Sequence, residues 1–251
     1  GRLQRKFSVH TIPSLLKIPV GLFQALWIIL SEKPNVVLSF GGYPAVPVVI
    51  ASWLFSIPVI IHEQTLKLGL ANKISSYFAD KIAVSFGDSD KGEKVILTGN
   101  PIRREILSRC ILERTDLKGY TLPKVPTILV VGGNQGAHII NVAFEHALDK
   151  ILQIAFVIHI TGDNKFKDFE RLEKFQNDRY KVNKWVGKRY GDTLQKADLV
   201  VCRAGINTLM ELTVLGKPAL SIPIAFQKEQ DKNAKYFKRL GFLKILPQQK
   251  L

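Results

Sequence analysis

The residues best suited to chemistry follow one short apolar run, Leu199 to Cys202, which predicts a buried parallel strand. Arg203 ends this run, and Thr208 falls in the first turn of the helix that should follow. A cation and a helix N-terminus beside a strand end are suited to binding a diphosphate. Glu211 lies one turn further on, where a carboxylate could accept hydrogen bonds from a ribose diol. This stretch therefore predicts a nucleotide site.

The elements around these residues must form a strand–helix–strand unit. Ala204-Gly205 predicts a tight turn, and the helical pattern runs from Ile206 to Leu215. Gly216-Lys217-Pro218 should stop the helix, and Ala219 to Pro223 predicts the next strand. Such crossovers are right-handed, and their ligands bind at the carboxyl ends of the strands.

A second phosphate-binding loop is expected at Gly132 to Ala137, between a strand at Thr127–Val131 and a helix at His138–Leu148. Strand, glycine loop and helix in this order suit phosphate binding, although the loop is not GxGxxG and lacks that motif's acidic ribose partner. The amide of Asn134 could donate a hydrogen bond to a phosphoryl oxygen.

The first part of the chain has a comparable pattern. Gly41-Gly42 separates a predicted strand, Val36–Phe40, from a predicted helix, Val46–Phe55, and either lets backbone N–H groups approach a phosphate or makes only a tight turn. The next strand, Val59–Ile61, delivers His62, Glu63 and Gln64 to the same sheet edge, where they form either a sugar-binding cluster or a structural pair.

Arg103 is a further candidate anion ligand. It follows a short predicted strand, Val95–Leu97, in the segment Gly99-Asn100-Pro101-Ile102-Arg103-Arg104, where Pro101 suits the first turn of a helix. An arginine in this place can bind an anion bidentately.

Composition restricts the function classes. The 251 residues have 46% hydrophobic content and a formal charge of +15, so we expect a globular protein with anionic partners or simply a basic, solvated surface. No nucleic-acid motif is recognised and basic residues are not interleaved with aromatic ones, so no nucleic-acid partner is expected. Cys110 and Cys202 make no disulfide framework and lack metal-ligand spacing, which indicates a reducing compartment.

The apolar stretch Ile18–Leu30 is too short to span a bilayer and contains Pro19, Gly21 and Gln24. It predicts either a core helix or a segment, within Leu15–Trp27, that dips into a membrane surface.

Five stretches together resemble the MurG family, the bacterial peptidoglycan N-acetylglucosaminyltransferases. They are Gly41-Gly42-Tyr43, His62-Glu63-Gln64, Gly99-Asn-Pro-Ile-Arg103, Gly132-Gly-Asn-Gln-Gly-Ala137, and Arg203-Ala-Gly-Ile-Asn-Thr-Leu-Met-Glu211 continued by Gln230-Asp-Lys-Asn-Ala234. The resemblance implies an α/β protein of the GT-B type, with two Rossmann-like doubly wound domains that face each other across a cleft. It places an acceptor- and membrane-facing domain at residues 1–101 and a UDP-GlcNAc-binding domain at 102–251, with linker-like composition at residues 110–126.

The resemblance also implies roles for individual residues. Ile206 would meet the uracil through its backbone, Glu211 the ribose and Gln230 the donor sugar. The donor-binding set is Arg103, Asn134, Gln135, Gly136, Arg203, Ile206, Thr208, Glu211 and Gln230. The acceptor-binding set is Gly41, Gly42, Tyr43, His62, Glu63, Gln64 and Thr65.

The implied reaction is the inverting transfer of N-acetylglucosamine from UDP-GlcNAc to the muramoyl sugar of the undecaprenyl-diphosphate-linked peptidoglycan precursor. This would place the protein peripherally on the cytoplasmic face of the bacterial membrane, against its anionic surface, with a part in cell-wall biogenesis, cell shape and division. UDP-GlcNAc is a substrate, so no cofactor is expected. Helix N-termini can stabilise the departing UDP without a tightly bound metal. The alternatives are a non-catalytic module that binds a nucleotide-sugar or lipid diphosphate, and a GT-B transferase with another lipid acceptor.

Several positions depart from the family pattern. Asn134 stands where the family usually has Ser, and Thr65 where it has Asn. Nothing before Gly41 matches the family's glycine-rich loop with its His, and the family continues past the position of Leu251. We therefore expect a relative truncated at both ends that transfers little or no sugar as given. Its general base is unassigned, with His62 as the first candidate.

Overall fold

The computed structural model describes residues 11–87, 92–108, 125–133, 135–241 and 243–251. The chain divides into two compact units, Gly1–Asn100 and Pro101–Leu251. The boundary expected from the sequence lies one residue further along the chain. Most of the linker-like segment at residues 110–126 lies outside the described residues.

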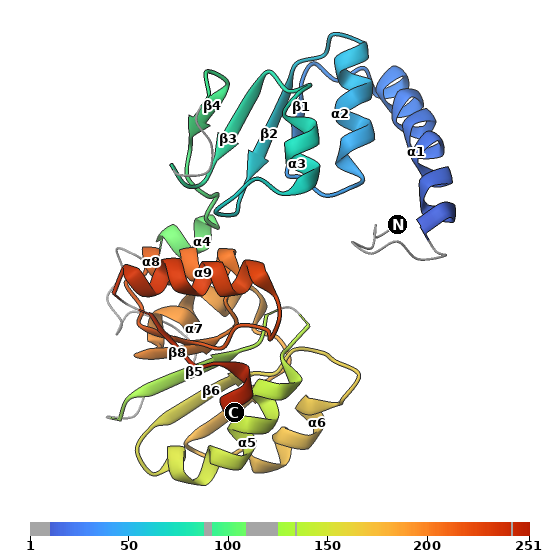
Figure 1. Ribbon diagram of the computed structural model, residues 1–251. Helices are drawn as coiled ribbons and strands as arrows, with labels where there is room; N and C mark the ends of the chain where they lie inside the picture. The colour runs from blue at the N-terminus through green and yellow to red at the C-terminus, as the bar shows by residue number, and fades with distance from the viewer. Residues whose placement is uncertain (1–10, 88–91, 109–124, 134, 242) are drawn as a thin grey trace. The chain divides into compact units, whose positions relative to one another are not determined.

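Unit 1 is built on a parallel sheet with the strand order β1-β2-β3-β4 (Figure 1). Its strands are β1 (Val37–Ser39), β2 (Val59–Glu63), β3 (Lys81–Val84) and β4 (Val95–Leu97), and its helices are α1 (Thr11–Glu32), α2 (Ala45–Leu54) and α3 (Leu70–Ser75). The core of this unit includes Val49, Val59, Ile61 and Val84. The carboxyl end of β2 carries His62 and Glu63, as the sequence predicts.

Helix α1 packs on unit 1 along one face, which confirms the core-helix alternative for that face; the membrane-surface alternative stays a prediction. Ala25 and Ile29 are buried against α2, where they pack on Ala51. On the other side of the helix, Phe23 and Trp27 have exposed fractions of 74% and 71%. One face of α1 is thus part of the core, whereas the two large rings are not. No helix in the described ranges is long and apolar enough to cross a bilayer.

Unit 2 contains a six-stranded parallel sheet with the order β10-β9-β8-β5-β6-β7. The strands are β5 (Thr127–Val131), β6 (Phe156–Ile160), β7 (Tyr180–Asn183), β8 (Leu199–Cys202), β9 (Ala219–Ser221) and β10 (Leu243–Ile245). The helices are α4 (Arg104–Leu107), α5 (His138–Leu152), α6 (Asp168–Leu172), α7 (Tyr190–Lys196), α8 (Ile206–Val214) and α9 (Lys228–Arg239). Helices α5 and α6 cover one face of the sheet, and α7, α8 and α9 lie on the other (Figure 1).

The central strands β5, β6 and β8 are nearly continuous apolar runs, which is the composition that burial on both faces requires. The chain begins in the middle of the sheet at β5, runs outward through β6 and β7, and returns to pair β8 with the opposite edge of β5. The strand order therefore reverses between β5 and β8. In open α/β sheets, a crevice for ligands forms at this switch point.

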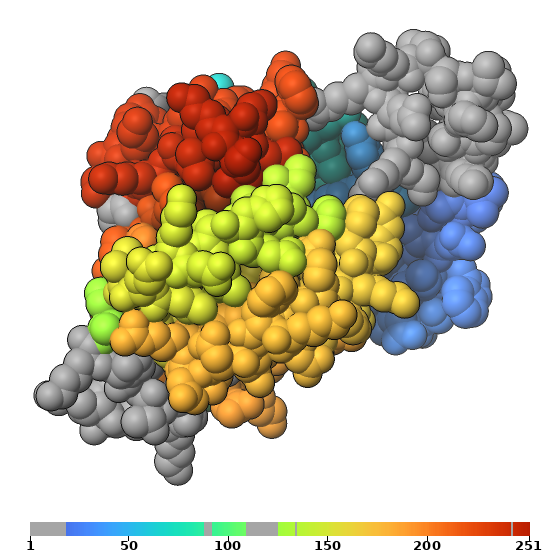
Figure 2. All heavy atoms as spheres, turned by 90° about the horizontal axis from the view of Figure 1, so that it is seen from below, coloured from blue at the N-terminus to red at the C-terminus, as the bar shows by residue number. Residues whose placement is uncertain are grey.

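A buried polar chain crosses the sheet face beneath α5, on the side of unit 2 that Figure 2 shows in space-filling form. His159 on β6 lies between Tyr180 Oη at 2.8 Å from Nδ1 and Asn141 Oδ1 at 3.0 Å from Nε2. The Asn141 amide donates to Asp168 Oδ2 and to the Thr161 carbonyl, so its oxygen faces His159. Nε2 of His159 then carries the proton and Tyr180 donates to Nδ1. Neutral His159 is fully paired in this arrangement.

Burial lowers the pKa of His159 to about 3, although the Asp168 charge opposes this shift. In the unfolded chain the imidazole has its ordinary pKa near 6.5. Between these two pKa values the unfolded state binds a proton that the folded state does not bind. The contribution of His159 to the free energy of unfolding is therefore fully present above pH 6.5 and decreases as the pH falls.

We expect protonation of His159 in the unfolded state to lower the free energy of unfolding by about 2 kcal/mol as the pH falls from 7 to 5. His159→Gln, which keeps a donor and an acceptor but cannot titrate, should show a correspondingly flatter dependence. Urea unfolding of both proteins at several pH values measures the difference. Parallel pH profiles for the two proteins would contradict this assignment.

Candidate functional site

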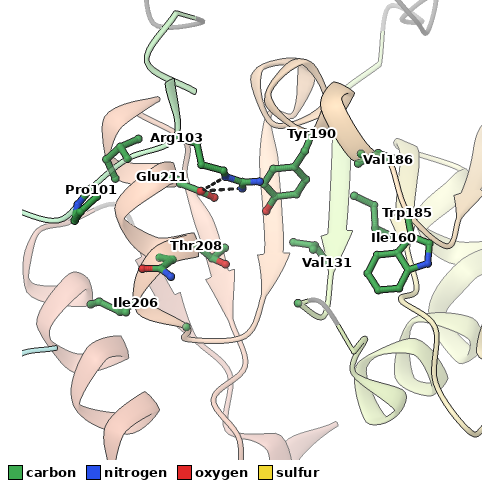
Figure 3. Close-up of a pocket in the computed structure, with 15 residues that line it drawn as sticks. Pro101, Arg103, Val131, Ile160, Trp185, Val186, Tyr190, Ile206, Thr208 and Glu211 are labelled. Carbon is green, nitrogen blue, oxygen red and sulfur yellow. Dashed lines mark hydrogen bonds and ion pairs between the residues drawn. The ribbon is translucent and has the colours of Figure 1, made fainter. Parts of the chain in front are cut away.

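A pocket of about 620 Å³ opens at the switch point of the unit 2 sheet. Its floor is made by the strand ends Val131 and Ile160, and its sides by residues from three other segments (Figure 3). The lining residues are Pro101, Ile102, Arg103, Val131, Gly133, Ile160, Trp185, Val186, Gly187, Tyr190, Gly205, Ile206, Asn207, Thr208 and Glu211. This volume falls within the range of small-molecule sites.

Helix α8 places Ile206, Thr208 and Glu211 on the pocket. The helix starts after Gly205, whose extended backbone (φ −70°, ψ 132°) makes no side-chain cap. The first N–H groups of a helix have no partner within the helix and carry partial positive charge. The N-terminus of α8 can therefore bind an anion, as the sequence predicts.

Glu211 is held by Arg103. Its Oε1 atom accepts a hydrogen bond of 2.8 Å from Arg103 Nε and forms an ion pair with Nη2, also at 2.8 Å. The Glu211 side chain is only 8% exposed, whereas that of Arg103 is 49% exposed. Burial raises the pKa of Glu211, and the hydrogen bonds and charge of Arg103 act against that shift. Arg103 thus keeps a buried carboxylate available as an acceptor.

Most residues of the pocket were not among the predicted site residues, and three of them have side chains that shape it: Trp185, Val186 and Tyr190. Trp185 and Val186 follow the carboxyl end of β7, and Tyr190 begins α7. The Tyr190 ring lies under the guanidinium of Arg103, with 4.6 Å from Cζ to the ring centroid. A position just after a parallel strand was a usable signal for Trp185 and Val186, but Tyr190 enters the pocket only through the turn at residues 187–189.

The glycine loop after β5 is shaped by close backbone contacts. Gly136 has φ +70°, and a Cβ atom there would lie 1.9 Å from the Thr161 carbonyl oxygen. Gly162 faces it, because a Cβ atom on Gly162 would meet the Gly136 nitrogen at 2.3 Å. The loop between β5 and α5 is therefore packed directly on the loop after β6. Asn134 lies outside the described residues.

The other predicted donor residues lie apart from the pocket lining. Arg203 donates from Nη1 to the Ile222 carbonyl at 3.0 Å and to Gln248 Oε1 at 2.8 Å. Gln230 Oε1 accepts a hydrogen bond from the Ile224 backbone at 3.0 Å. Gln135 and Gly136 belong to the loop that reaches the pocket through Gly133. The structure thus gathers Arg103, Ile206, Thr208 and Glu211 in one pocket and gives Arg203 and Gln230 partners within the protein.

In unit 1, the buried Glu63 carboxylate organises the chain that follows β2. Its Oε1 lies 3.0 Å from the Thr65 nitrogen and 2.8 Å from Thr65 Oγ1. Its Oε2 accepts from the Gly69 nitrogen at 2.8 Å and from Asn72 Nδ2 at 2.9 Å. Glu63 therefore fixes the loop and the start of α3. Thr65 Oγ1 also lies 2.7 Å from the Lys67 carbonyl oxygen, so this residue closes the loop.

His62 and Asn72 retain unused hydrogen-bonding capacity beside Glu63. His62 Nε2 lies 3.1 Å from the Gly99 carbonyl, and the Phe40 ring is 5.5 Å from the imidazole. Within the described residues, His62 Nδ1 and Asn72 Oδ1 are buried without a hydrogen-bond partner. Such atoms are costly unless a ligand or water satisfies them. Asn72 was not predicted from the sequence because it lies on α3, away from the strand ends.

The remaining predicted acceptor residues surround this cluster. Gly41 and Gly42 have φ values of +85° and +87°, and a Cβ atom on Gly41 would meet Asn72 Oδ1 at 2.8 Å. Tyr43 is partly exposed, and Gln64 is half-buried beside Glu63.

No group of three or more His, Cys, Asp or Glu side chains that could hold a metal occurs in the described part of the chain.

Two parallel α/β units, with a pocket at the switch point of the second, define the GT-B class of nucleotide-sugar enzymes. The profiles of the glycosyltransferase family 28 N-terminal and C-terminal domains match residues 1–84 and 127–251. The chain belongs to this family.

Individual relatives agree with this assignment. A UDP-N-acetylglucosamine–N-acetylmuramyl-(pentapeptide) pyrophosphoryl-undecaprenol N-acetylglucosamine transferase from Clostridium botulinum strain Hall is 39% identical over 100% of this chain and 71% of its own length. The Clostridium kluyveri protein of the same name is 36% identical over 99% of this chain and 71% of its own. The crystal structure of Acinetobacter baumannii MurG superposes with a TM-score of 0.71 at 26% identity, covering 100% of this chain and 69% of that one.

The loop contacts predict different costs for two glycine substitutions. Gly133→Ala should cost only the strain of a left-handed alanine, about 1–2 kcal/mol, because no atom of the described residues lies within 4 Å of the added Cβ. Gly136→Ala adds an overlap with the Thr161 backbone, so we expect about 2–5 kcal/mol. Urea unfolding measures both costs, and equal values for the two variants would show that the loops are not packed as described.

Proposed function

We propose that this protein transfers N-acetylglucosamine from UDP-GlcNAc to the muramoyl sugar of an undecaprenyl-diphosphate-linked peptidoglycan precursor. The observation that carries the proposal is the pocket at the unit 2 switch point, where Arg103 holds the Glu211 carboxylate beside the N-terminus of α8. The substrates are inferred from the family, because the chain belongs to glycosyltransferase family 28 and its relatives are named for this transfer.

The donor's nucleotide occupies this pocket. Glu211 accepts hydrogen bonds from the ribose hydroxyls, and the diphosphate lies toward the N-terminus of α8 and the glycine loop that opens α5. Negative charge grows on the diphosphate as the glycosidic bond breaks. Oriented N–H groups at the two helix N-termini stabilise this charge, so the leaving group needs no tightly bound metal.

The acceptor's polar head binds the unit 1 cluster around His62 and Asn72. Within the described residues each has a buried atom without a protein partner, which is the condition for recognising a hydroxyl or phosphoryl group. The Glu63 carboxylate already accepts hydrogen bonds from the Thr65 and Gly69 nitrogens and from Asn72 Nδ2, so it positions the cluster. His62 is the candidate to take the proton from the attacking hydroxyl.

Removing Glu211 tests the donor site. We expect Glu211→Ala to weaken UDP binding by about 1–3 kcal/mol, because Arg103 and the ribose diol both lose a charged partner. Isothermal titration calorimetry measures the affinity, and transfer of radiolabelled GlcNAc to the lipid-linked acceptor measures the reaction. Lys235→Ala is the matched control, since Lys235 pairs only with the exposed Asp231 among the interactions described. Unchanged UDP affinity in Glu211→Ala would remove this residue from the site.

We further propose that unit 1 contacts an anionic membrane surface through α1. Val20, Phe23, Trp27 and Leu30 are exposed at spacings of three or four residues, so they form one apolar stripe along the helix. Contiguous apolar surface of this kind marks an interaction site. The excess positive charge of the chain favours an anionic surface as the partner.

Vesicle binding separates this role from packing. Phe23→Ser with Trp27→Ser should weaken binding to anionic vesicles by at least about tenfold, since burying one large apolar side chain contributes about 1.5–3 kcal/mol. The melting temperature and UDP affinity should change little, because both rings are exposed. The control Ile29→Ala should lower the melting temperature and leave vesicle binding of the folded protein intact. Unchanged vesicle binding of the double variant would leave positive charge as the cause of any membrane affinity.

A further inference from the structure

Arg103 has two carboxylates within reach. Glu211 Oε1 accepts a hydrogen bond of 2.8 Å from Nε and lies 2.8 Å from Nη2, whereas Glu105 Oε1 lies 3.6 Å from Nη1. Glu105 is 39% exposed and lies in the short helix α4, which begins just after Arg103. The Arg103 side chain is 49% exposed, so a further contact on the guanidinium would help to hold it on Glu211.

Tyr190 supplies that contact. Its ring centroid is 4.6 Å from Arg103 Cζ, within the range of a cation–π interaction, and the close-up shows the guanidinium between the Glu211 carboxylate and the Tyr190 ring (Figure 3). The Tyr190 hydroxyl is also hydrogen-bonded with Arg103. The ring itself is anchored, because Tyr190 begins α7, whose Leu194 is fully buried and whose Thr193 hydroxyl donates to the Arg189 carbonyl. The helix after Arg103 is anchored by the fully buried Ile106, but the Arg103 side chain itself is 49% exposed.

We infer that Tyr190 is a positioning residue of the donor site: its ring holds the Arg103 guanidinium on Glu211, and thereby fixes the carboxylate that recognises the ribose diol. This inference rests on the proposed function, in which Glu211 binds the ribose. Tyr190 acts through Arg103 and need not touch the ribose.

The inference predicts a loss of discrimination for the ribose hydroxyls and not a general loss of affinity. The measured quantity is the ratio of the dissociation constants of 2′,3′-dideoxy-UDP and UDP. Tyr190→Leu should lower this ratio about two- to fivefold, as expected for the loss of one cation–π contact at a partly exposed site. Tyr190→Phe keeps the ring and loses only the hydrogen bond between the hydroxyl and Arg103, so it should keep more of the ratio than Tyr190→Leu does. Arg103→Gln should lower the ratio at least as far, and adding Tyr190→Leu to Arg103→Gln should lower it no further.

Calorimetry on the full chain with both nucleotides, and melting curves for every variant, provides the test. If Tyr190→Leu does not fold, Tyr190→Met fills a similar volume without a ring and takes its place. Equal weakening of both nucleotides by the ringless variant would mean that Tyr190 packs on the base, and would overturn the inference. A loss of discrimination in Tyr190→Phe as large as that in Tyr190→Leu, or full additivity of the Tyr190 and Arg103 substitutions, would overturn it as well.

The same measurements distinguish the inference from the function on which it rests. If the unaltered protein binds UDP with discrimination and Glu211→Gln removes it, while Tyr190→Leu does not, only the role of Tyr190 fails. If the unaltered protein binds UDP no better than the dideoxy nucleotide, the ribose assignment of Glu211 fails, and the role of Tyr190 falls with it.

Discussion

The Arg103–Glu211 ion pair is the interaction on which the unit 2 site depends. A carboxylate that is 8% exposed at the edge of a sheet would favour its protonated form, and burial does raise its pKa. One hydrogen bond of 2.8 Å from Nε and a second contact of 2.8 Å from Nη2 oppose that shift and fix the orientation of the oxygen. The strand ends, the α8 N-terminus and the Tyr190 ring then form a pocket around a charge whose position is already set. Removing either partner would therefore disturb both the electrostatics and the shape of the pocket.

Much of this architecture could be predicted from the sequence because local pattern and fold agree. The strands at Leu199–Cys202 and Thr127–Val131 and the start of α8 at Ile206 are where the apolar runs and the glycine turns place them. The pairing of Arg103 with Glu211 could not be predicted, since 108 residues separate them and only the tertiary fold brings them together. Tyr190 was missed for the same reason: its sequence neighbours give no sign that its ring meets an arginine from another segment. The roles assigned to Arg203 and Gln230 remain predictions, because both residues have protein partners here.

Helix α1 shows why its sequence left two alternatives. A helix that is apolar nearly all round gives no single polar face by which to orient it. Packing decides: Ala25 and Ile29, four residues apart, meet α2, and Phe23 and Trp27, also four residues apart, remain exposed. The small side chain of Ala25 lets the two helices approach, whereas the two large rings lie where α2 does not reach. One face of the segment is thus part of the core and another is an apolar surface, so a core helix leaves room for the predicted membrane contact.

Buried polar groups in both units fall into two kinds: structural residues already have hydrogen-bond partners in the protein, whereas candidate ligand-binding residues keep an atom that can still bond. Asp168 and Glu63 are buried acids with several protein donors each, and hydrogen bonds from Asn141, His138 and Asn164 outweigh the burial of Asp168, so that its pKa lies below its ordinary value. Such groups hold loops in place and have little capacity left for a substrate. His62 and Asn72 differ, because each keeps a buried atom without a partner within the described residues. The sequence placed His62 and Glu63 together as equals on one strand end. Their hydrogen bonds separate their roles. Glu63 is hydrogen-bonded to the loop that follows it and to α3, whereas His62 keeps a nitrogen that is available to an acceptor hydroxyl.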